Sequence, residues 1–296
     1  MREDRRGALL VFGSALTWSF GGAIARFLSV SDSWAIIFWR SVFAALFLLG
    51  FMLMRDGPRG TKQLFASMGL AGVGVGLCFA TASIAFVVAL AHTTVANILL
   101  MQAGVPLFAA LMAFVLFRES VTLATWLAIA AVIAGVGIMV SASFGGQVSP
   151  VGDGLALLIS LSFAAATVIS RRHAHVRMMP AACLSTIVAL LVAATQAGNF
   201  NVSAVDAGLL FLFGALNLGL GMIFFVRGVR LLPSAVAALI GTAEPVLGPL
   251  WVWLVHGEIP GTRTLFGGAV VFGALLAHLI WQFRQQRQEA AVPMAD

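Results

Sequence analysis

The chain has 296 residues, of which 61% are hydrophobic and only 9% are charged, and its mean hydropathy is +1.04. Soluble domains carry about 25% charged residues and present much of their surface to water, so this composition excludes a soluble globular protein and indicates lipid as the solvent. The net charge of +6 comes from short basic clusters between apolar runs, which suits anionic lipid headgroups and argues against a nucleic-acid partner.

The first apolar run begins at Gly7, directly after a basic N-terminal segment. A cleavable signal peptide has to be weighed, because Ala23-Ile24-Ala25 resembles a cleavage site. The run is more than twice the length of a minimal signal-peptide core, and its removal would delete one member of the internal repeat described below. We therefore expect it to be retained as the first membrane span.

Ten apolar runs follow one another along the chain, separated by short breaks that carry charges, glycine or proline. A helix needs about 20 mostly apolar residues to cross a bilayer, and each run approaches that length. The predicted fold class is an all-α integral membrane protein with ten transmembrane helices. The predicted spans are 7–27, 34–54, 65–89, 93–117, 122–141, 154–171, 178–197, 207–227, 234–255 and 264–283.

The basic residues predict the orientation of these spans. With ten spans, 14 of the 17 Lys and Arg residues fall on the side that holds both termini. Loops rich in Lys and Arg remain in the cytoplasm, so both termini are expected to be cytoplasmic. The expected location is the bacterial inner membrane, as a multi-pass protein in contact with the lipid bilayer.

The two halves of the chain resemble each other at an offset of 139 residues, which places Pro106 on Pro245 and Glu119 on Glu258. Any two apolar helices look alike, but the shared spacing of 13 residues between proline and glutamate argues against coincidence. Because five spans per unit is an odd number, the second unit must be inverted, as in many transporters. The expected divisions are a first unit at 1–141, an external loop at 142–153, a second unit at 154–283 and a cytoplasmic tail at 284–296.

The order and spacing of several short motifs resemble the drug/metabolite transporter superfamily of the EamA type. These motifs are Trp18-Ser19-Phe20-Gly21 in the first span, Arg40 early in the second, Pro106 followed by Glu119, and Glu244-Pro245 followed by Gly257-Glu258. The resemblance implies export of small metabolites by alternating access, and among its members the aromatic amino-acid exporters look most similar. The second unit departs from the pattern, because it has Ser185 or a neighbour where the first unit has Arg40.

Pro106 and Pro245 lie inside the fourth and ninth predicted spans. A proline removes one helical hydrogen bond and leaves the carbonyl four residues earlier without its partner, here on Gln102 and Gly241. Such breaks are tolerated where neighbours or cavity water satisfy the carbonyl. We predict that both prolines act as hinges beside the transport pathway, while simple packing kinks are the alternative.

Two charged residues lie well inside predicted spans. Glu244 is expected to bind a substrate ammonium group or to carry a coupling proton. The alternative is a structural role, either protonated against a freed backbone carbonyl or paired with Arg40. Arg40 is expected to contact a substrate carboxylate through its planar guanidinium, with snorkelling or a structural ion pair as alternatives.

Neutral polar groups, together with tryptophan and methionine, occur at intermediate depths of several spans and suit a neutral, partly apolar solute. Each such residue taken alone is more often a contact between helices than a ligand-binding group. The predicted pathway residues of this kind are Thr17, Trp18, Ser83, Asn97, Met101, Gln102, Ser162 and Asn217.

Other functions are less consistent with the sequence. Cys78 and Cys183 lie in apolar runs, and neither they nor the histidines have metal-ligand spacing, so no metal or cofactor is expected. An intramembrane enzyme would need a paired nucleophile and base or two carboxylates at one depth, and none is evident. A membrane scaffold or receptor remains as an alternative that needs no polar cavity. The expected partner is a small-molecule substrate, and a homodimer stays open.

Overall fold

The computed structural model describes residues 2–118, 120–144, 149–173, 175–232 and 234–291, and every regular element in these ranges is a helix. Glu119, which the comparison of the two halves used, lies outside the described residues. The first half contains α1 (Arg2–Ser19), α2 (Gly21–Phe27), α3 (Ser33–Ser67), α4 (Gly69–Ala89), α5 (Val95–Gln102), α6 (Val105–Phe117) and α7 (Leu123–Phe144). The second contains α8 (Pro150–Arg172), α9 (Met179–Gln196), α10 (Ala204–Phe211), η1 (Leu212–Leu220), α11 (Gly221–Gly228), η2 (Val229–Leu231), α12 (Ser234–Gly241), α13 (Ala243–His256) and α14 (Thr262–Ala291).

The length and composition of these helices fit a membrane protein. Among the described residues, eight helical stretches are long and apolar enough to cross a bilayer, and α5 with α6 makes a ninth if this bent pair counts as one span. Large apolar side chains such as Leu70, Leu123 and Ile259 are exposed on the bundle surface, as a lipid-facing exterior requires. Helices suit this environment because each satisfies its own backbone hydrogen bonds.

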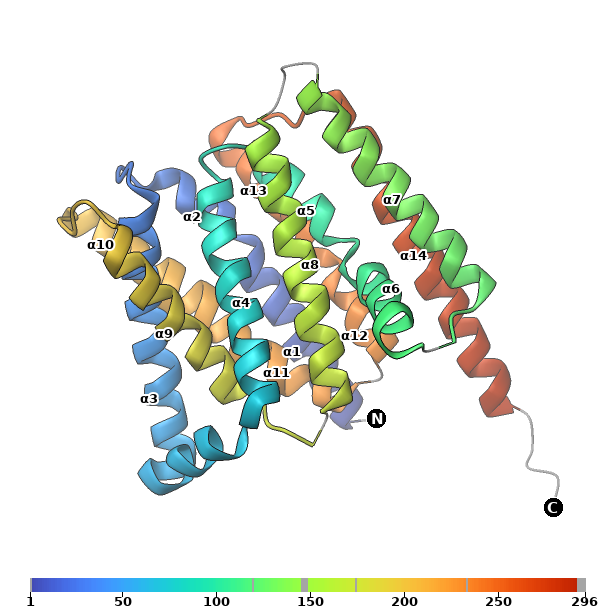
Figure 1. The fold of residues 1–296 in the computed structure, drawn as a ribbon, viewed down its shortest axis with the longest axis horizontal. Coiled ribbons are helices and arrows are strands. Elements are labelled where there is room, and N and C mark those ends of the chain that lie inside the picture. The colour runs from blue at the N-terminus through green and yellow to red at the C-terminus, as the bar shows by residue number, and fades with distance from the viewer. Residues whose placement is uncertain (1, 119, 145–148, 174, 233, 292–296) are drawn as a thin grey trace.

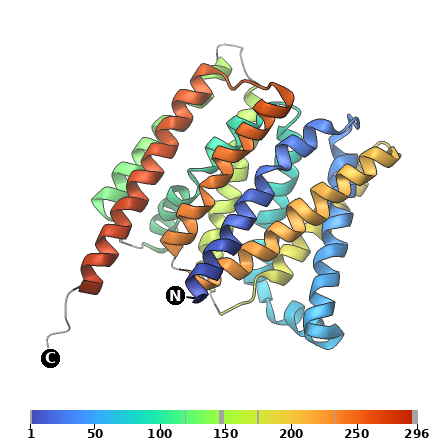
Figure 2. The same cartoon turned by 180° about the vertical axis from the view of Figure 1, so that it is seen from behind.

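The helices form one elongated bundle in which the start of α1 and the end of α14 lie at the same end (Figure 1). α7 and α14 pack along each other at one edge, and α3 packs against α9 at the opposite side (Figures 1 and 2). Between them, α4 packs against α8 and α9, while α1 packs against α11 and α13. The largest apolar core cluster lies where α5 and α8 meet α7 and α14.

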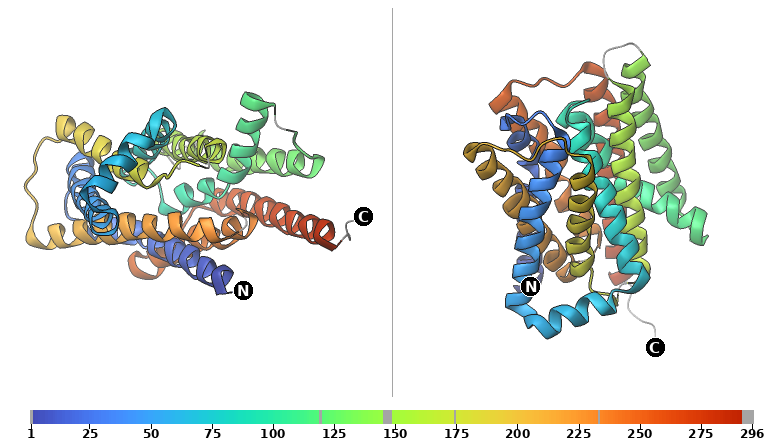
Figure 3. Two further views of the ribbon diagram at one scale, coloured as in Figure 1. Left: turned by 90° about the horizontal axis from the view of Figure 1, so that it is seen from below. Right: turned by 60° about the vertical axis from the view of Figure 1, so that its left-hand side comes forward.

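The second span is longer than predicted. We expected it to end at residue 54, before a loop, but α3 continues to Ser67 through a kink at Gly57. Gly57 has φ 68° and ψ 173°, which a residue with a Cβ rarely adopts, and Pro58 then begins the second helical piece. Residues 58–67 run across the end of the bundle towards α4 (Figure 3). The predicted break is therefore present at Gly57, but it is a single non-helical residue between two helical pieces and not a loop that extends to residue 64.

Four helical stretches of the described chain are interrupted within the bundle. α1 and α2 are separated at Phe20, α5 and α6 are bent by 44°, and α12 and α13 are separated at Thr242. Between α10 and α11 the chain forms a π-helix, η1, over nine residues. Such interruptions expose backbone groups and re-aim side chains, and in membrane proteins they are tolerated where protein or water satisfies those groups.

Candidate functional site

Arg40 is buried in the bundle and has a relative exposure of only 6%. Its Nη1 atom donates a hydrogen bond to Ser83 Oγ at 2.9 Å, and its guanidinium carbon lies 4.3 Å from the ring centroid of Phe213. Its Nε atom is buried without a partner among the described residues, and no described carboxylate pairs with it. Arg40 therefore neither snorkels to a membrane surface nor pairs with Glu244.

Asn217 lies in η1, on the helix that packs against α3 and α1, and is 5% exposed. Its Nδ2 atom donates to the carbonyl oxygens of Thr17 at 2.6 Å and Trp18 at 3.2 Å, just before the break at Phe20. The side chain thus satisfies backbone acceptors where α1 ends. The side-chain amide of Asn217 therefore connects the π-helix to the break in α1.

The same segment of η1 also contacts Arg40. Gly214 lies against the Arg40 carbonyl so closely that a Cβ at this position would collide with it. Gly221, the first residue of α11, lies against the indole of Trp18. The Nε1 atom of this indole is buried without a partner among the described residues. The structure thus brings five predicted residues around η1, from α1, α3, α4 and η1 itself. We call this the η1 cluster: Thr17, Trp18, Arg40, Ser83 and Asn217.

The remaining predicted pathway residues lie elsewhere. Asn97, 1% exposed, donates to Asp153 Oδ1 at 2.6 Å and to Thr93 Oγ1 at 3.0 Å, and so joins the start of α5 to the start of α8. Met101 is fully buried in the apolar core, Ser162 is buried in α8, and Gln102 is half-buried at the end of α5. Asp153 was missed from the sequence because we placed it in the external loop, although an acid one residue before an apolar run can reach into the membrane.

Both prolines lie just after a break. Pro106 is the second residue of α6 and Pro245 the third residue of α13, so each break precedes its proline. A proline fits the first turn of a helix, where its missing N–H would have no helical partner.

Glu244 is the second residue of α13, half-buried, and forms no hydrogen bond or ion pair with a described residue.

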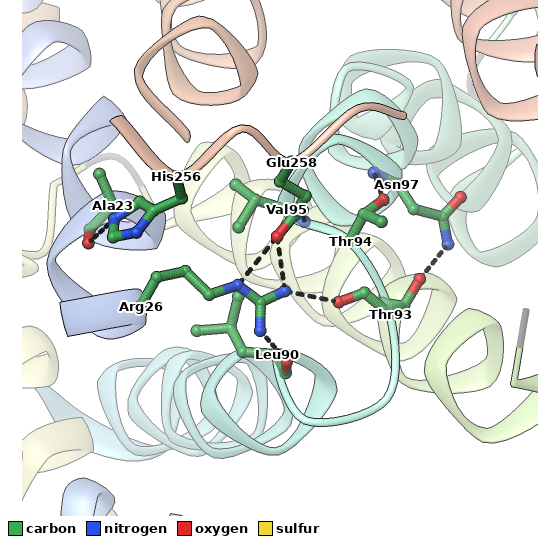
Figure 4. A network of polar contacts seen from close by, with 9 residues as sticks. All are labelled: Ala23, Arg26, Leu90, Thr93, Thr94, Val95, Asn97, His256 and Glu258. Atoms are coloured by element: carbon green, nitrogen blue, oxygen red, sulfur yellow. Dashed lines mark hydrogen bonds and ion pairs between the residues drawn. The ribbon is translucent and has the colours of Figure 1, made fainter. Parts of the chain in front are cut away.

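A second polar network lies at the opposite end of the bundle from the start of α1, and Figure 4 shows it. Arg26 Nε and Nη2 each lie 2.9 Å from Glu258 Oε2. Arg26 also donates to the carbonyl oxygens of Leu90 at 2.8 Å and Thr93 at 3.2 Å. Glu258 Oε1 accepts from the Val95 backbone N–H at 2.9 Å. These contacts, which we call the Arg26–Glu258 network, connect α2, the α4–α5 turn and the segment after α13.

A neighbouring contact supports this network. His256 Nε2 lies 3.0 Å from the Ala23 carbonyl oxygen, and its ring packs edge-on against Phe27 at a centroid distance of 4.5 Å. In the sequence, Glu258 stood out only as a marker of the repeat, and Arg26 was not singled out. Their pairing could have been predicted from one feature: both are charged residues at the ends of predicted spans, on the same predicted side of the membrane.

Apolar helices of membrane-spanning length, with charged and polar groups buried between them, define a multi-span helical membrane protein. A model of the EamA-like transporter family matches residues 5–141 and again residues 150–280, and the chain belongs to this family, a branch of the drug/metabolite transporter superfamily. It is therefore a membrane transporter, as the sequence motifs indicated.

Two further comparisons agree. The pseudopaline exporter CntI of Pseudomonas aeruginosa, in strains UCBPP-PA14 and PAO1, is 24% identical over 281 residues, covering 92% of this chain and 95% of the relative. A solved crystal structure, described only as that of a protein, superposes with a TM-score of 0.64 at 18% identity and covers 94% of this chain and 98% of that one. The latter shows that the fold is shared.

Proposed function

We propose that this protein exports small metabolites, amino acids among them, across the bacterial inner membrane by alternating access. The observation that carries the proposal is the η1 cluster, in which a buried arginine of α3 and a buried asparagine of η1 lie on packed helices from the two halves. Charged groups inside a membrane bundle are costly, and they commonly mark the path of a solute. The pseudopaline exporter adds support for export of a small metabolite.

The packing supports an arrangement of two inverted five-helix units with ten spans in all. Contacts between the two units occur in equivalent pairs. α4 packs against α8 as α11 packs against α1, and α3 packs against η1 as α9 packs against α4. The pairs α3–α9 and α7–α14 join equivalent helices of the two units. The family model also matches each half separately. With the basic residues on the side of the termini, this arrangement gives an N-in, C-in topology.

Alternating access needs a barrier on one side of the solute site. We assign this role on the outer side to the Arg26–Glu258 network, because it ties two elements of the first unit to the segment following α13 of the second. Opening towards the outside would require these contacts to separate. Rocking of one unit against the other would do so, since the network spans both.

The test is solute flux in proteoliposomes that contain the purified protein. We expect counterflow of at least one labelled amino acid or of pseudopaline, above that of liposomes without protein and saturable with solute concentration. A screen with and without a pH gradient would show whether a proton is coupled. Saturable flux would not be expected of a scaffold or receptor, and chemical conversion of a solute or lipid without flux would favour an intramembrane enzyme.

A further inference from the structure

We infer that Arg40 is the recognition site for a carboxylate group of the transported solute. This inference rests on the proposed function and specifies its substrate class as small molecules with at least one carboxylate. The starting observation is a guanidinium in the interior of a lipid-solvated bundle that no described carboxylate neutralises. A buried charge normally has a paired counter-charge, because its desolvation is otherwise uncompensated.

The compensation that the protein itself supplies to Arg40 is partial. Ser83 gives one neutral acceptor, and the ring faces of Phe213 and Phe86 lie 4.3 and 5.9 Å from the guanidinium carbon. Cation–π contacts stabilise a guanidinium but satisfy none of its N–H groups. An anionic ligand would supply both the charge and the acceptors that these neighbours lack.

The free edge of the guanidinium has the right shape for that ligand. Ser83 occupies Nη1, whereas Nε is buried without a partner and Nη2 makes no hydrogen bond to a described residue. The Nε and Nη2 hydrogens point in parallel from one edge of the planar group. This edge matches the two oxygens of a carboxylate in bidentate geometry, which a lysine could not provide.

The carboxylates of the protein that lie near the same spans are occupied elsewhere. Asp153 accepts from Asn97, and Asp206 accepts from Ser29 and Ser203. Glu258 is held in the Arg26–Glu258 network. The remaining internal carboxylate, Glu244, forms no ion pair with a described residue. The counter-charge for Arg40 is therefore not supplied by these groups in this conformation.

Trp18 provides a second, independent observation. Its Nε1 donor is also buried without a described partner, and it faces the same helix, η1–α11, that Arg40 contacts through Phe213 and Gly214. Each of these two buried donors lies on a helix that packs against η1–α11, and a buried donor without an acceptor indicates a place where an acceptor atom arrives with a ligand.

The experiment compares matched pairs of solutes, neutral amino acids and their carboxamides, which differ in the carboxylate and little in size. Purified protein is tested for thermal stabilisation and for counterflow in proteoliposomes, in the wild type, Arg40→Gln and Arg40→Lys. Arg284→Gln, which removes an exposed arginine at the end of α14, is the matched control. We expect at least one acid to stabilise and exchange about tenfold more effectively than its amide, and Arg40→Gln to abolish this preference.

Arg40→Lys keeps the charge but lacks the fork, and should retain a reduced preference for the acid. If Arg40→Gln does not fold, the test uses Arg40→Lys and Ser83→Ala. Ser83→Ala should weaken exchange of the acid, but the acid should still be exchanged faster than its amide. Three results would overturn the inference. Acid and amide could act equally on the wild type, or the preference for the acid could be unchanged in Arg40→Gln and Arg40→Lys. The third is that no acid stabilises the protein at millimolar concentration. Flux of amides equal to that of acids leaves the proposed function standing without the Arg40 site, whereas stabilisation by acids without any flux leaves the site and removes the transport function.

Discussion

Replacing Glu258 with glutamine weakens the Arg26–Glu258 network while keeping the shape of the side chain. If the network holds the outer side closed, Glu258→Gln should raise the fraction of molecules that are open to the outside. The change removes the charge that faces Arg26 Nε and Nη2, but leaves one oxygen that still accepts from the Val95 N–H.

The size of the effect follows from these contacts. A hydrogen bond to a charged group contributes about 1.5–3 kcal/mol, whereas exposed ion pairs contribute about 0–1 kcal/mol. The side chains of Arg26 and Glu258 are 30% and 20% exposed, so an intermediate value of about 1.5–2 kcal/mol is reasonable. Because about 1.4 kcal/mol is a factor of ten, the open fraction should rise about 10- to 30-fold.

The assay is labelling of a cysteine placed behind the network, at Ala23, by a membrane-impermeant maleimide. Ala23 is buried and lies about one turn before Arg26 on α2. Cys78 and Cys183 are first replaced by alanine. When opening is rare, the labelling rate is proportional to the open fraction, so Glu258→Gln should accelerate labelling 10- to 30-fold. Arg263→Gln is the control, because Arg263 binds Ser141 on the same face and not the network.

The same variant should also reduce net transport, because a transporter that stays open on one side completes fewer cycles. Melting temperatures of all variants must be measured, so that faster labelling by partial unfolding is recognised. Equal labelling rates in Glu258→Gln and the parent, with unchanged flux, would show that the network is a static contact and that the outer barrier lies elsewhere.

Three further substitutions probe the interrupted helices. Asn217→Leu removes the donors to the Thr17 and Trp18 carbonyls with little change in volume, and should lower the free energy of unfolding by about 1–3 kcal/mol in denaturant titrations. An unchanged stability would mean that water replaces the amide. Pro106→Ala and Pro245→Ala should reduce flux more than melting temperature, because alanine permits a continuous helix across the break; wild-type flux in well-folded variants would make the breaks incidental.

The positions of the helices could be predicted because membrane spans are encoded by length and apolarity, which are local properties of the chain. The predicted start of the eighth span at 207 and that of α10 at Ala204 differ by three residues, and the ninth predicted span contains both α12 and α13. The end of α3 was missed because Gly57-Pro58 is read equally well as a turn and as a kink. The π-helix at Leu212–Leu220 has no local signature, since it depends on packing against α1 and α3.

The candidate site was predictable only in part. Arg40 and Asn217 were singled out because polar groups at membrane depth are unusual, and that criterion needs no partner. The contacts of the site could not be predicted in this way. Arg40 and Ser83 are 43 positions apart in the sequence, and Arg26 and Glu258 are 232 positions apart. Such contacts depend on how helices distant in the sequence pack against each other, which a single sequence does not determine. The same holds for Asp153, whose carboxylate is reached by Asn97 from another helix.

Glu244 allows two mechanisms to be separated by one substitution. It lies in the first turn of α13, where the helix dipole favours a carboxylate, and it has no described partner that would fix a structural role. If it carries a coupling proton, Glu244→Gln should abolish uptake driven by a pH gradient but leave counterflow intact, because the amide cannot titrate. If it binds a substrate ammonium, binding should weaken by about 1.5–3 kcal/mol, and both modes should slow at low substrate concentration.

Both modes are therefore measured in the same proteoliposomes, with Asp56→Asn as a control carboxylate in the C-terminal half of α3, where it lies 3.9 Å from Arg177. A carboxylate with a purely structural role predicts neither pattern, because glutamine replaces it with nearly the same shape. Unchanged rates in both modes would remove Glu244 from the mechanism. In that case Arg40 of the η1 cluster would still bind the solute, and selection of the solute would depend on its carboxylate and not on its amino group.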